Sequence, residues 1–282
     1  MKTLTAALMF GAFLRMACHA GDTALFAEKS TWETVGEGYQ IAEGLAGSKD
    51  GMVYLTDVPA SKLLRIDASG KESVLDAQTA KANGLANGPD GLLYAACMGG
   101  PQILFWNLES GERGSIALPT PANDLVITAD GRLYYTWGPA DAVYQLDLTD
   151  PKPVKVGEIR HPNGITLSHD GKELWVGAFF SDTVHAFPIL ADGTLGPARP
   201  AFKAKVPPHG KGLLDGMLPL GDGRLLVATA LGLQILSKDA EPVLIPNPTG
   251  KRANYVRILT DPGGQRWIYA VHENSVLRRR AL

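Results

Sequence analysis

The chain has 282 residues, of which 45% are hydrophobic and 20% are charged, so this composition excludes a mainly disordered protein. Lys and Arg total 27 against 29 Asp and Glu, and the resulting formal charge of −2 argues against a nucleic acid as the main partner. The 32 glycines and 19 prolines suit a protein with many tight turns, whereas two cysteines are too few for a disulfide framework.

The first segment of the chain has the features of an export signal. Lys2 precedes an apolar run over residues 3–14 that is too short to cross a bilayer as a helix, and Ala20 is a small residue suited to cleavage. We therefore expect residues 1–20 to be a signal peptide, with a buried N-terminal helix as the alternative. Residues 21–282 are expected to form one domain of a secreted or periplasmic protein that has no membrane contact in its mature form.

A repeated pattern organises the remainder of the chain. Each copy has a polar residue, a short apolar alternation, an Asp-Gly or near equivalent that begins seven residues later, and then an apolar strand. The leading polar residues are Glu43, Asn83, Asn123, Asn163, Asp215 and Asn254, so the copies begin 40, 40, 40, 52 and 39 residues apart. Because Asp-Gly tolerates the positive φ of a tight turn, each copy predicts a hairpin.

The repeat predicts an all-β protein. About four short strands in each ~40–45 residues are typical of a propeller blade, and helical periodicity is nearly absent after residue 20. We predict a six-bladed β-propeller with four-stranded antiparallel blades around a central tunnel. Residues 24–41 are expected to supply an outer strand that closes the ring onto the last blade. The extra residues 192–212, before the fifth copy, form either a lid over one mouth or a long outer hairpin.

The six leading polar residues are the candidate ligands of a metal ion. Equivalent positions of six inner strands converge on the tunnel, and all six side chains offer oxygen. Two carboxylates, Glu43 and Asp215, would repel one another there, and a divalent cation would remove that cost. Carboxylate and amide oxygens suit Ca²⁺ or Mg²⁺. The alternative is a hydrogen-bonded polar plug, and one ion cannot reach all six residues, so Asn83 and Asn254 are alternatively polar lining.

Four segments carry a resemblance to a known family: Glu43-Gly44, Asn123-Asp124, His161-Pro162-Asn163-Gly164-Ile165 and Leu214-Asp215-Gly216-Met217. Over roughly residues 36–280 the chain resembles the senescence-marker-protein/gluconolactonase/luciferin-regenerating-enzyme family, to which the calcium propellers diisopropylfluorophosphatase and the paraoxonases are related. The resemblance implies that Glu43, Asn163 and Asp215 hold a catalytic divalent cation. It also implies that Asn123 is a further ligand or a substrate contact. Pro121 stands where sugar-lactonase members often carry an arginine, so the chain departs from their pattern there.

The resemblance implies a hydrolase that opens a lactone. A metal with open positions polarises an ester carbonyl, and Asp215 is the expected catalytic residue because it can also accept a proton from water. Ca²⁺ is the expected ion, with Mg²⁺, Mn²⁺ or Zn²⁺ as alternatives, and a small-molecule lactone or ester is the expected substrate. The alternatives are a phosphotriesterase of the diisopropylfluorophosphatase type and a non-catalytic ligand-binding propeller with a structural ion.

Further side chains are candidates for substrate binding because of their places in the repeat. They are Asn83, Asn123, His209, His272, Trp137 and Phe179. Trp137 and Phe179 follow strands and can wall a pocket, although strand aromatics usually pack in the core. His161 lies two residues before Asn163 and can share its facing, with a purely structural role as the alternative.

Overall fold

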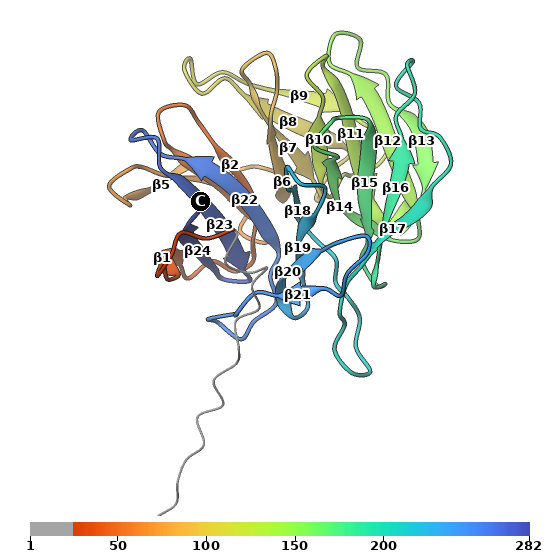
Figure 1. Ribbon diagram of the computed structural model, residues 1–282. Helices are drawn as coiled ribbons and strands as arrows, with labels where there is room; N and C mark the ends of the chain where they lie inside the picture. Colours follow the sequence, from red (N-terminus) through yellow and green to blue (C-terminus); the bar gives the residue numbers. More distant parts are fainter. Residues whose placement is uncertain (1–24) are drawn as a thin grey trace, which may run out of the picture.

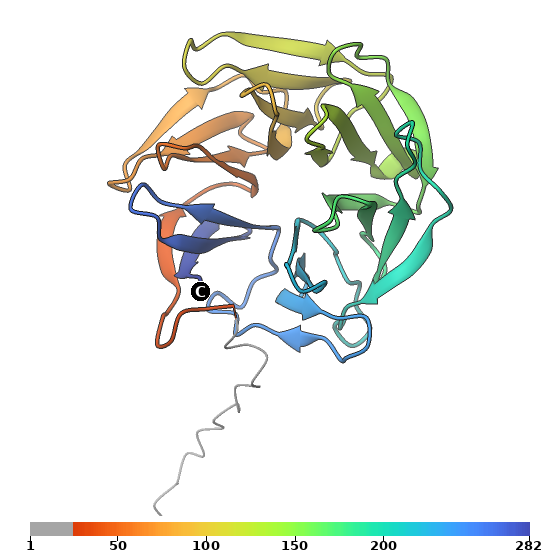
Figure 2. The same cartoon turned by 45° about the horizontal axis from the view of Figure 1, so that its top comes forward.

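The structure is a computed structural model that describes residues 25–282 as six four-stranded antiparallel sheets around a central channel (Figure 1, Figure 2). The predicted all-β, six-bladed β-propeller is therefore confirmed. Within residues 25–282 the one helical element is the 3-10 turn η1 (Gly138–Ala140), and no helix is long and apolar enough to cross a bilayer. The predicted signal peptide, residues 1–20, lies outside the described residues.

Each blade begins with its innermost strand and continues outward. The first blade is β2 (Ala42–Gly47), β3 (Val53–Asp57), β4 (Lys62–Ile66) and β5 (Glu72–Asp76), and the second is β6 (Ala82–Asn87), β7 (Leu93–Cys97), β8 (Gln102–Trp106) and β9 (Arg113–Ala117). The third is β10 (Leu125–Ile127), β11 (Arg132–Trp137), β12 (Ala142–Asp147) and β13 (Val154–Glu158). The fourth is β14 (Pro162–Leu167), β15 (Glu173–Ala178), β16 (Thr183–Pro188) and β17 (Arg199–Lys203). The fifth is β18 (Met217–Pro219), β19 (Leu225–Thr229), β20 (Gly232–Leu236) and β21 (Val243–Leu244).

The sixth blade joins the two ends of the described chain. It consists of β22 (Tyr255–Thr260), β23 (Arg266–His272), β24 (Ser275–Arg280) and β1 (Glu33–Glu37). The early strand β1 pairs antiparallel with β24, from Glu33 opposite Arg278 to Glu37 opposite Ser275. This confirms that residues 24–41 supply the outer strand of the last blade. Such closure stabilises the ring because the last blade gains its fourth strand from the other end of the sequence.

The Asp-Gly turns have the predicted backbone conformation. Gly51 and Gly91, for example, have φ values of 81° and 84°, which an L-residue rarely adopts. The Gly51 amide donates a hydrogen bond of 3.0 Å to the Ser48 carbonyl, which tightens the first of these turns. These turns fix where each inner strand ends and the next strand of the blade begins.

Hydrophobic side chains pack mainly between neighbouring blades. In one such cluster Leu63 of the first blade meets Leu85 and Leu93 of the second, and all three are fully buried. Cys97 lies in the same cluster, and burial raises the pKa of its thiol to about 11. Because the apolar core lies between the sheets, the channel is left to the polar residues that begin each inner strand.

The extra residues 192–212 form part of an outer hairpin and then a connection. The Ile189–Leu195 bridge extends the hairpin from β16 toward β17, which is the outer strand of the fourth blade. Residues 204–212 then lead to the fifth blade. The first part therefore fits the outer-hairpin alternative, and within residues 25–282 no residue of 192–212 lines the central pocket.

Candidate metal and substrate site

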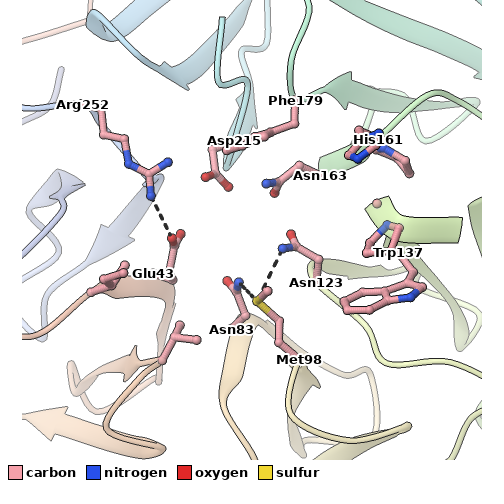
Figure 3. Close-up of a pocket in the computed structure, with 15 residues that line it drawn as sticks. Glu43, Asn83, Met98, Asn123, Trp137, His161, Asn163, Phe179, Asp215 and Arg252 are labelled. Atoms are coloured by element: carbon pink, nitrogen blue, oxygen red, sulfur yellow. Dashed lines mark hydrogen bonds and ion pairs between the residues drawn. The ribbon is translucent and has the colours of Figure 1, made fainter. Parts of the chain in front are cut away.

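Five of the six leading polar residues converge on one space at the mouth of the channel. Figure 3 shows the side chains of Glu43, Asn83, Asn123, Asn163 and Asp215 turned toward a common centre. They meet because each stands at or just before the start of an inner strand, and the six inner strands start at the same end of the ring. The cavity has a volume of about 330 Å³. Its lining comprises Ile41, Glu43, Val58, Asn83, Met98, Asn123, Trp137, Gly138, Pro139, His161, Pro162, Asn163, Phe179, Asp215 and Arg252.

Glycine after the leading residue lets adjacent blades approach closely enough to share this space. A Cβ atom on Gly164 would lie 1.9 Å from the Asp215 carbonyl oxygen of the next blade. The Gly216 amide donates a hydrogen bond of 2.9 Å to the Asn254 carbonyl in the following blade. The repeated leading-residue–glycine pair therefore sets the spacing of the candidate ligands.

Two buried threonines hold the backbone of the site across the blade boundary. Thr136 Oγ1 donates a hydrogen bond of 2.6 Å to the Asn163 carbonyl, and Thr56 Oγ1 donates one of 2.8 Å to the Asn83 carbonyl. Both threonines are fully buried on the second strand of the preceding blade. Their hydrogen bonds leave the Asn163 and Asn83 side chains free to face the pocket.

Several oxygen atoms in the site are buried without a hydrogen-bond partner. They include Glu43 Oε2, Asn123 Oδ1 and Asn163 Oδ1. A buried polar atom without a partner costs about 1–3 kcal/mol, so three such oxygens around one space fit the donor set of a hard cation. Across residues 25–282, no three His, Cys, Asp or Glu side chains gather into a metal-ligand group. A metal here would therefore need the amide oxygens as well as the two carboxylates.

The two carboxylates are electrostatically unfavourable on their own. Burial, with a further contribution from the Asp124 carboxylate, raises the pKa of Asp215 to about 8, although Arg252 opposes the shift. Burial also raises the pKa of Glu43 well above its ordinary value, and Asp215 adds to this. Both effects disfavour two negative charges in one enclosed space, and a divalent cation bound between them would offset that cost.

Asn254 supports Glu43 and does not line the pocket. Its Nδ2 atom donates hydrogen bonds of 2.9 Å to the Ala42 carbonyl and 3.2 Å to Glu43 Oε1, and the residue is fully buried. Of the two residues for which polar lining was the alternative, Asn83 faces the pocket, whereas Asn254 orients a neighbouring ligand candidate.

A second layer of polar residues packs among the inner strands. In two copies the residue after the leading one is not glycine, and these residues, Asp124 and Tyr255, meet across the ring: Tyr255 Oη donates a hydrogen bond of 2.9 Å to Asp124 Oδ1. Arg257 Nη2 in turn donates one of 2.7 Å to Tyr255 Oη. Asp124 fits because its neighbour is a glycine; a Cβ on Gly84 would lie 2.0 Å from Asp124 Oδ1. Burial raises the pKa of Asp124, and Arg257 opposes that shift.

Apolar and aromatic residues form much of the pocket wall. Trp137 ends β11 and Phe179 follows β15, and both line the pocket because second strands end where inner strands start. His161 also lines it, on a left-handed backbone with a φ of 49° that is held by a 2.7 Å hydrogen bond from its amide to Asp141 Oδ1. Figure 3 shows these three residues along one side of the oxygen ring, beside Asn123, Asn163 and Asp215.

Two predicted substrate-binding histidines do not line the pocket, which corrects their placement. His209 is exposed in a turn closed by the hydrogen bond from the Gly210 amide to the Pro207 carbonyl. His272 does end a second strand, as Trp137 does, but it is only 1% exposed, and its Nδ1 atom lies 3.3 Å from the Lys251 carbonyl. The next residue of that loop, Arg252, lines the pocket, and His272 does not.

Sequence reasoning missed Arg252 and Met98. Arg252 stands two residues before Asn254, the repeat position that His161 occupies before Asn163, so the same spacing contained a signal for it. Met98 follows the second strand of its blade, and its sulfur lies 2.9 Å from Asn83 Nδ2 and 3.7 Å from Asn123 Nδ2.

Comparison with known proteins gives a family match and several similar folds. A family model described as "SMP-30/Gluconolactonase/LRE-like region" matches residues 35–246, which is more than half of the chain. A search of curated protein sequences found no match. A gluconolactonase of Xanthomonas campestris superposes with a TM-score of 0.79 at 22% identity, over 94% of this chain and 93% of that one.

Two further structures share the fold at lower identity. Regucalcin of Agrobacterium tumefaciens, a calcium-binding protein, has a TM-score of 0.70 at 16% identity and covers 89% of this chain and 95% of its own. A streptogramin B lyase has a TM-score of 0.67 at 17% identity and covers 90% of this chain and 98% of its own. At these identities the likenesses establish the fold alone, and a lyase among them shows that the fold does not fix the reaction.

Proposed function

Because the chain belongs to the SMP-30/gluconolactonase/LRE-like family, we propose that it is a Ca²⁺-dependent hydrolase that opens a small-molecule lactone. The observation that carries the proposal is the convergence of partnerless buried oxygens beside two buried carboxylates. This donor set suits a hard divalent cation, and the adjoining walls leave room for a small organic molecule.

Glu43, Asn123, Asn163 and Asp215 are the residues that would hold the ion. When bound, a divalent cation supplies Lewis-acid polarisation of the ester carbonyl. Glu43 is oriented for this role by Asn254, and Asn163 is held by the Thr136 hydrogen bond to its carbonyl. These contacts keep the oxygens in place before an ion arrives, which reduces the entropy lost on binding.

Asp215 is the residue that would accept a proton from the attacking water. It is 5% exposed and lines the pocket, and burial raises the pKa of its carboxyl to about 8. A general base is most effective when its pKa lies near the working pH, and a bound cation would bring this value down toward that range. Trp137, Phe179 and Met98 form apolar parts of the wall of the same pocket.

A lactone panel measured with and without chelator tests the proposal. We expect turnover that disappears on metal removal and returns with Ca²⁺. Asp215→Asn and Glu43→Gln should each lower kcat/KM by at least about 100-fold, as for loss of one preorganised catalytic group. Asp222→Asn, which removes a carboxylate from an exposed turn of the same blade, is the matched control and should retain full activity.

Three outcomes would overturn the proposal. Undiminished lactone turnover after complete metal removal would exclude the metal-dependent reaction. A Ca²⁺-dependent rise in Tm with no hydrolysis of any lactone would favour a ligand-binding propeller with a structural ion. Turnover of a phosphotriester in place of lactones would assign the same pocket to the phosphotriesterase reaction.

We also propose that the protein is exported, on the sequence features of residues 1–20. Mass spectrometry of the protein from the periplasm or medium should find a mature chain that lacks these residues. The full-length chain confined to the cytoplasm would contradict export.

A further inference from the structure

A single guanidinium stands beside the ring of oxygen ligands. Arg252 Nη2 lies 3.6 Å from Glu43 Oε1, and its side chain is 23% exposed and lines the pocket. Within the described part of the chain it is the one lysine or arginine of the pocket lining, and it makes no hydrogen bond to any residue of 25–282. A guanidinium offers five N–H donors, so this side chain retains unused donors that a ligand in the pocket can accept from.

The loop that carries Arg252 is firmly anchored. Asn247 Nδ2 donates a hydrogen bond of 2.6 Å to the Lys251 carbonyl, and Lys251 Nζ donates one of 2.6 Å to Asn274 Oδ1. The Nδ1 atom of His272 lies 3.3 Å from the same carbonyl oxygen. Arg252 is therefore presented from a fixed backbone, which is a requirement for selective recognition.

Once a divalent cation is bound, no carboxylate of the site remains to neutralise the charge of Arg252. The carboxylates of Glu43 and Asp215 together balance one divalent ion, and Glu43 then serves the ion in place of the guanidinium. The neighbouring Asp124 already has Arg257 as its counter-charge, through Tyr255. The loaded pocket thus carries one positive charge in excess, and that charge lies at Arg252.

From this balance, which rests on the proposed function, we propose that Arg252 binds a carboxylate of the substrate and that the substrate class is an anionic lactone with an apolar body. An arginine fork matches a carboxylate in a bidentate geometry. Figure 3 places Arg252 across the pocket from Trp137, so a ligand anchored at the guanidinium directs its other end toward the apolar wall. Trp137, Met98 and Phe179 supply that wall.

The proposal separates this chain from enzymes that select neutral sugar lactones. Those substrates carry hydroxyl groups that need several hydrogen-bonding partners, whereas the apolar wall formed by Trp137, Met98 and Phe179 offers few such groups. Pro121 stands in the third blade at the repeat position that Arg252 occupies in the sixth. The guanidinium of this pocket therefore comes from the sixth blade, on the opposite side of the ring from the third-blade position at which sugar-lactonase members often carry an arginine.

The test uses a matched pair of probes: a γ-butyrolactone with a carboxylate on the carbon beside the ring oxygen, and the same lactone with a carboxamide there. We expect the wild-type protein to prefer the carboxylate by about 10–100-fold in kcat/KM, the range of one charge-assisted pair. At saturating Ca²⁺, Arg252→Gln should abolish the preference by lowering kcat/KM for the carboxylate far more than for the carboxamide, and Arg252→Lys should restore part of it. Arg65→Gln, which removes an exposed charge from the first blade, is the control.

Calorimetry provides a readout that does not depend on turnover. The ring-opened product of the carboxylate probe, 2-hydroxyglutarate, should bind the Ca²⁺-loaded wild-type protein at least tenfold more tightly than it binds Arg252→Gln. Equal turnover of both lactones with an unchanged ratio in Arg252→Gln would overturn this inference while the proposed function stands. Arg252-dependent binding without any lactone turnover would sustain the anion site and refute the hydrolase.

Discussion

Tyr255 and Asp124 come from the sixth and third blades, and the Tyr255 hydroxyl donates a hydrogen bond of 2.9 Å to Asp124 Oδ1. Both residues stand at the repeat position that is glycine in the other four copies. The two residues and Arg257 therefore form a hydrogen-bonded network that joins opposite blades across the channel. This network fixes the inner strands that carry Asn123 and Asn254.

Tyr255→Phe should destabilise the protein by about 1–3 kcal/mol, because it leaves the buried Asp124 carboxyl without one of its donors. Urea unfolding of the metal-free protein measures this difference. Tyr144→Phe is the control, since Tyr144 stacks on Tyr135 with ring centroids 5.0 Å apart and is half-buried. An equal effect of the two substitutions would contradict a specific role for the Tyr255 hydroxyl.

Gly164→Ala should disrupt both folding and metal binding. The new Cβ would lie 1.9 Å from the Asp215 carbonyl, and the clash is with backbone, so relief requires two inner strands to separate. Overpacking of this kind costs about 1–3 kcal/mol or more, and it would displace Asn163 from Asp215. Unfolding midpoints and Ca²⁺ calorimetry measure the two consequences. Gly100→Ala, where the nearest atom to a Cβ is 3.8 Å away, should change neither.

The fold was predictable because each of six copies of one sequence pattern predicts the same four-stranded blade. Spacing assigns each leading residue to the start of an inner strand, and closure of the ring brings such positions together. Trp137 and Phe179 could be placed for the same reason, since they end second strands. Arg252 follows the same register, in a copy that has Tyr255 in place of the glycine after the leading residue.

Features outside the repeat could not be placed from the sequence. His209 lies in the inserted segment, which has no counterpart in other copies to fix its facing. His272 has the register of a pocket residue, but it is buried against the Lys251 carbonyl, and such a contact depends on tertiary packing. Likewise, the hydrogen bond between Tyr255 and Asp124 joins residues 131 positions apart, and no local sequence pattern predicts that contact.

The stability of the metal-free protein should fall as the pH rises from about 4 to 8. Asp215 has an ordinary pKa of 3.8, which burial raises to about 8 in the folded state, so over this interval the folded protein binds more protons than the unfolded chain. A group with a raised folded pKa contributes stability that is lost as pH rises through that value. Thermal melts in chelator at pH 5 and pH 8 measure the trend.

A control is needed for the pH effect, because burial lowers the pKa of His185 and His272, and these groups act with the opposite sign near pH 6. Asp215→Asn removes this carboxylate and keeps both histidines. As the pH rises from about 4 to 8, the Tm of the variant should therefore rise relative to the Tm of the wild type. Ca²⁺ should stabilise the wild-type protein more at pH 8 than at pH 5, since protons compete with the ion for Asp215. A larger Ca²⁺-dependent shift in Tm at pH 5 would contradict this assignment.

Arg252→Gln should increase the affinity for Ca²⁺ by about tenfold, or ~1.4 kcal/mol. The guanidinium lies 3.6 Å from Glu43 Oε1, so it competes with Ca²⁺ for this carboxylate. It also repels Ca²⁺ electrostatically, because both carry positive charge. Calorimetric titration with Ca²⁺ at low ionic strength measures the change, and added salt should reduce it because the side chain is partly exposed. Arg252→Lys keeps the charge and should show little change. If the glutamine variant bound Ca²⁺ more weakly than the lysine variant, Arg252 would be supporting the ion's ligands instead of competing for them.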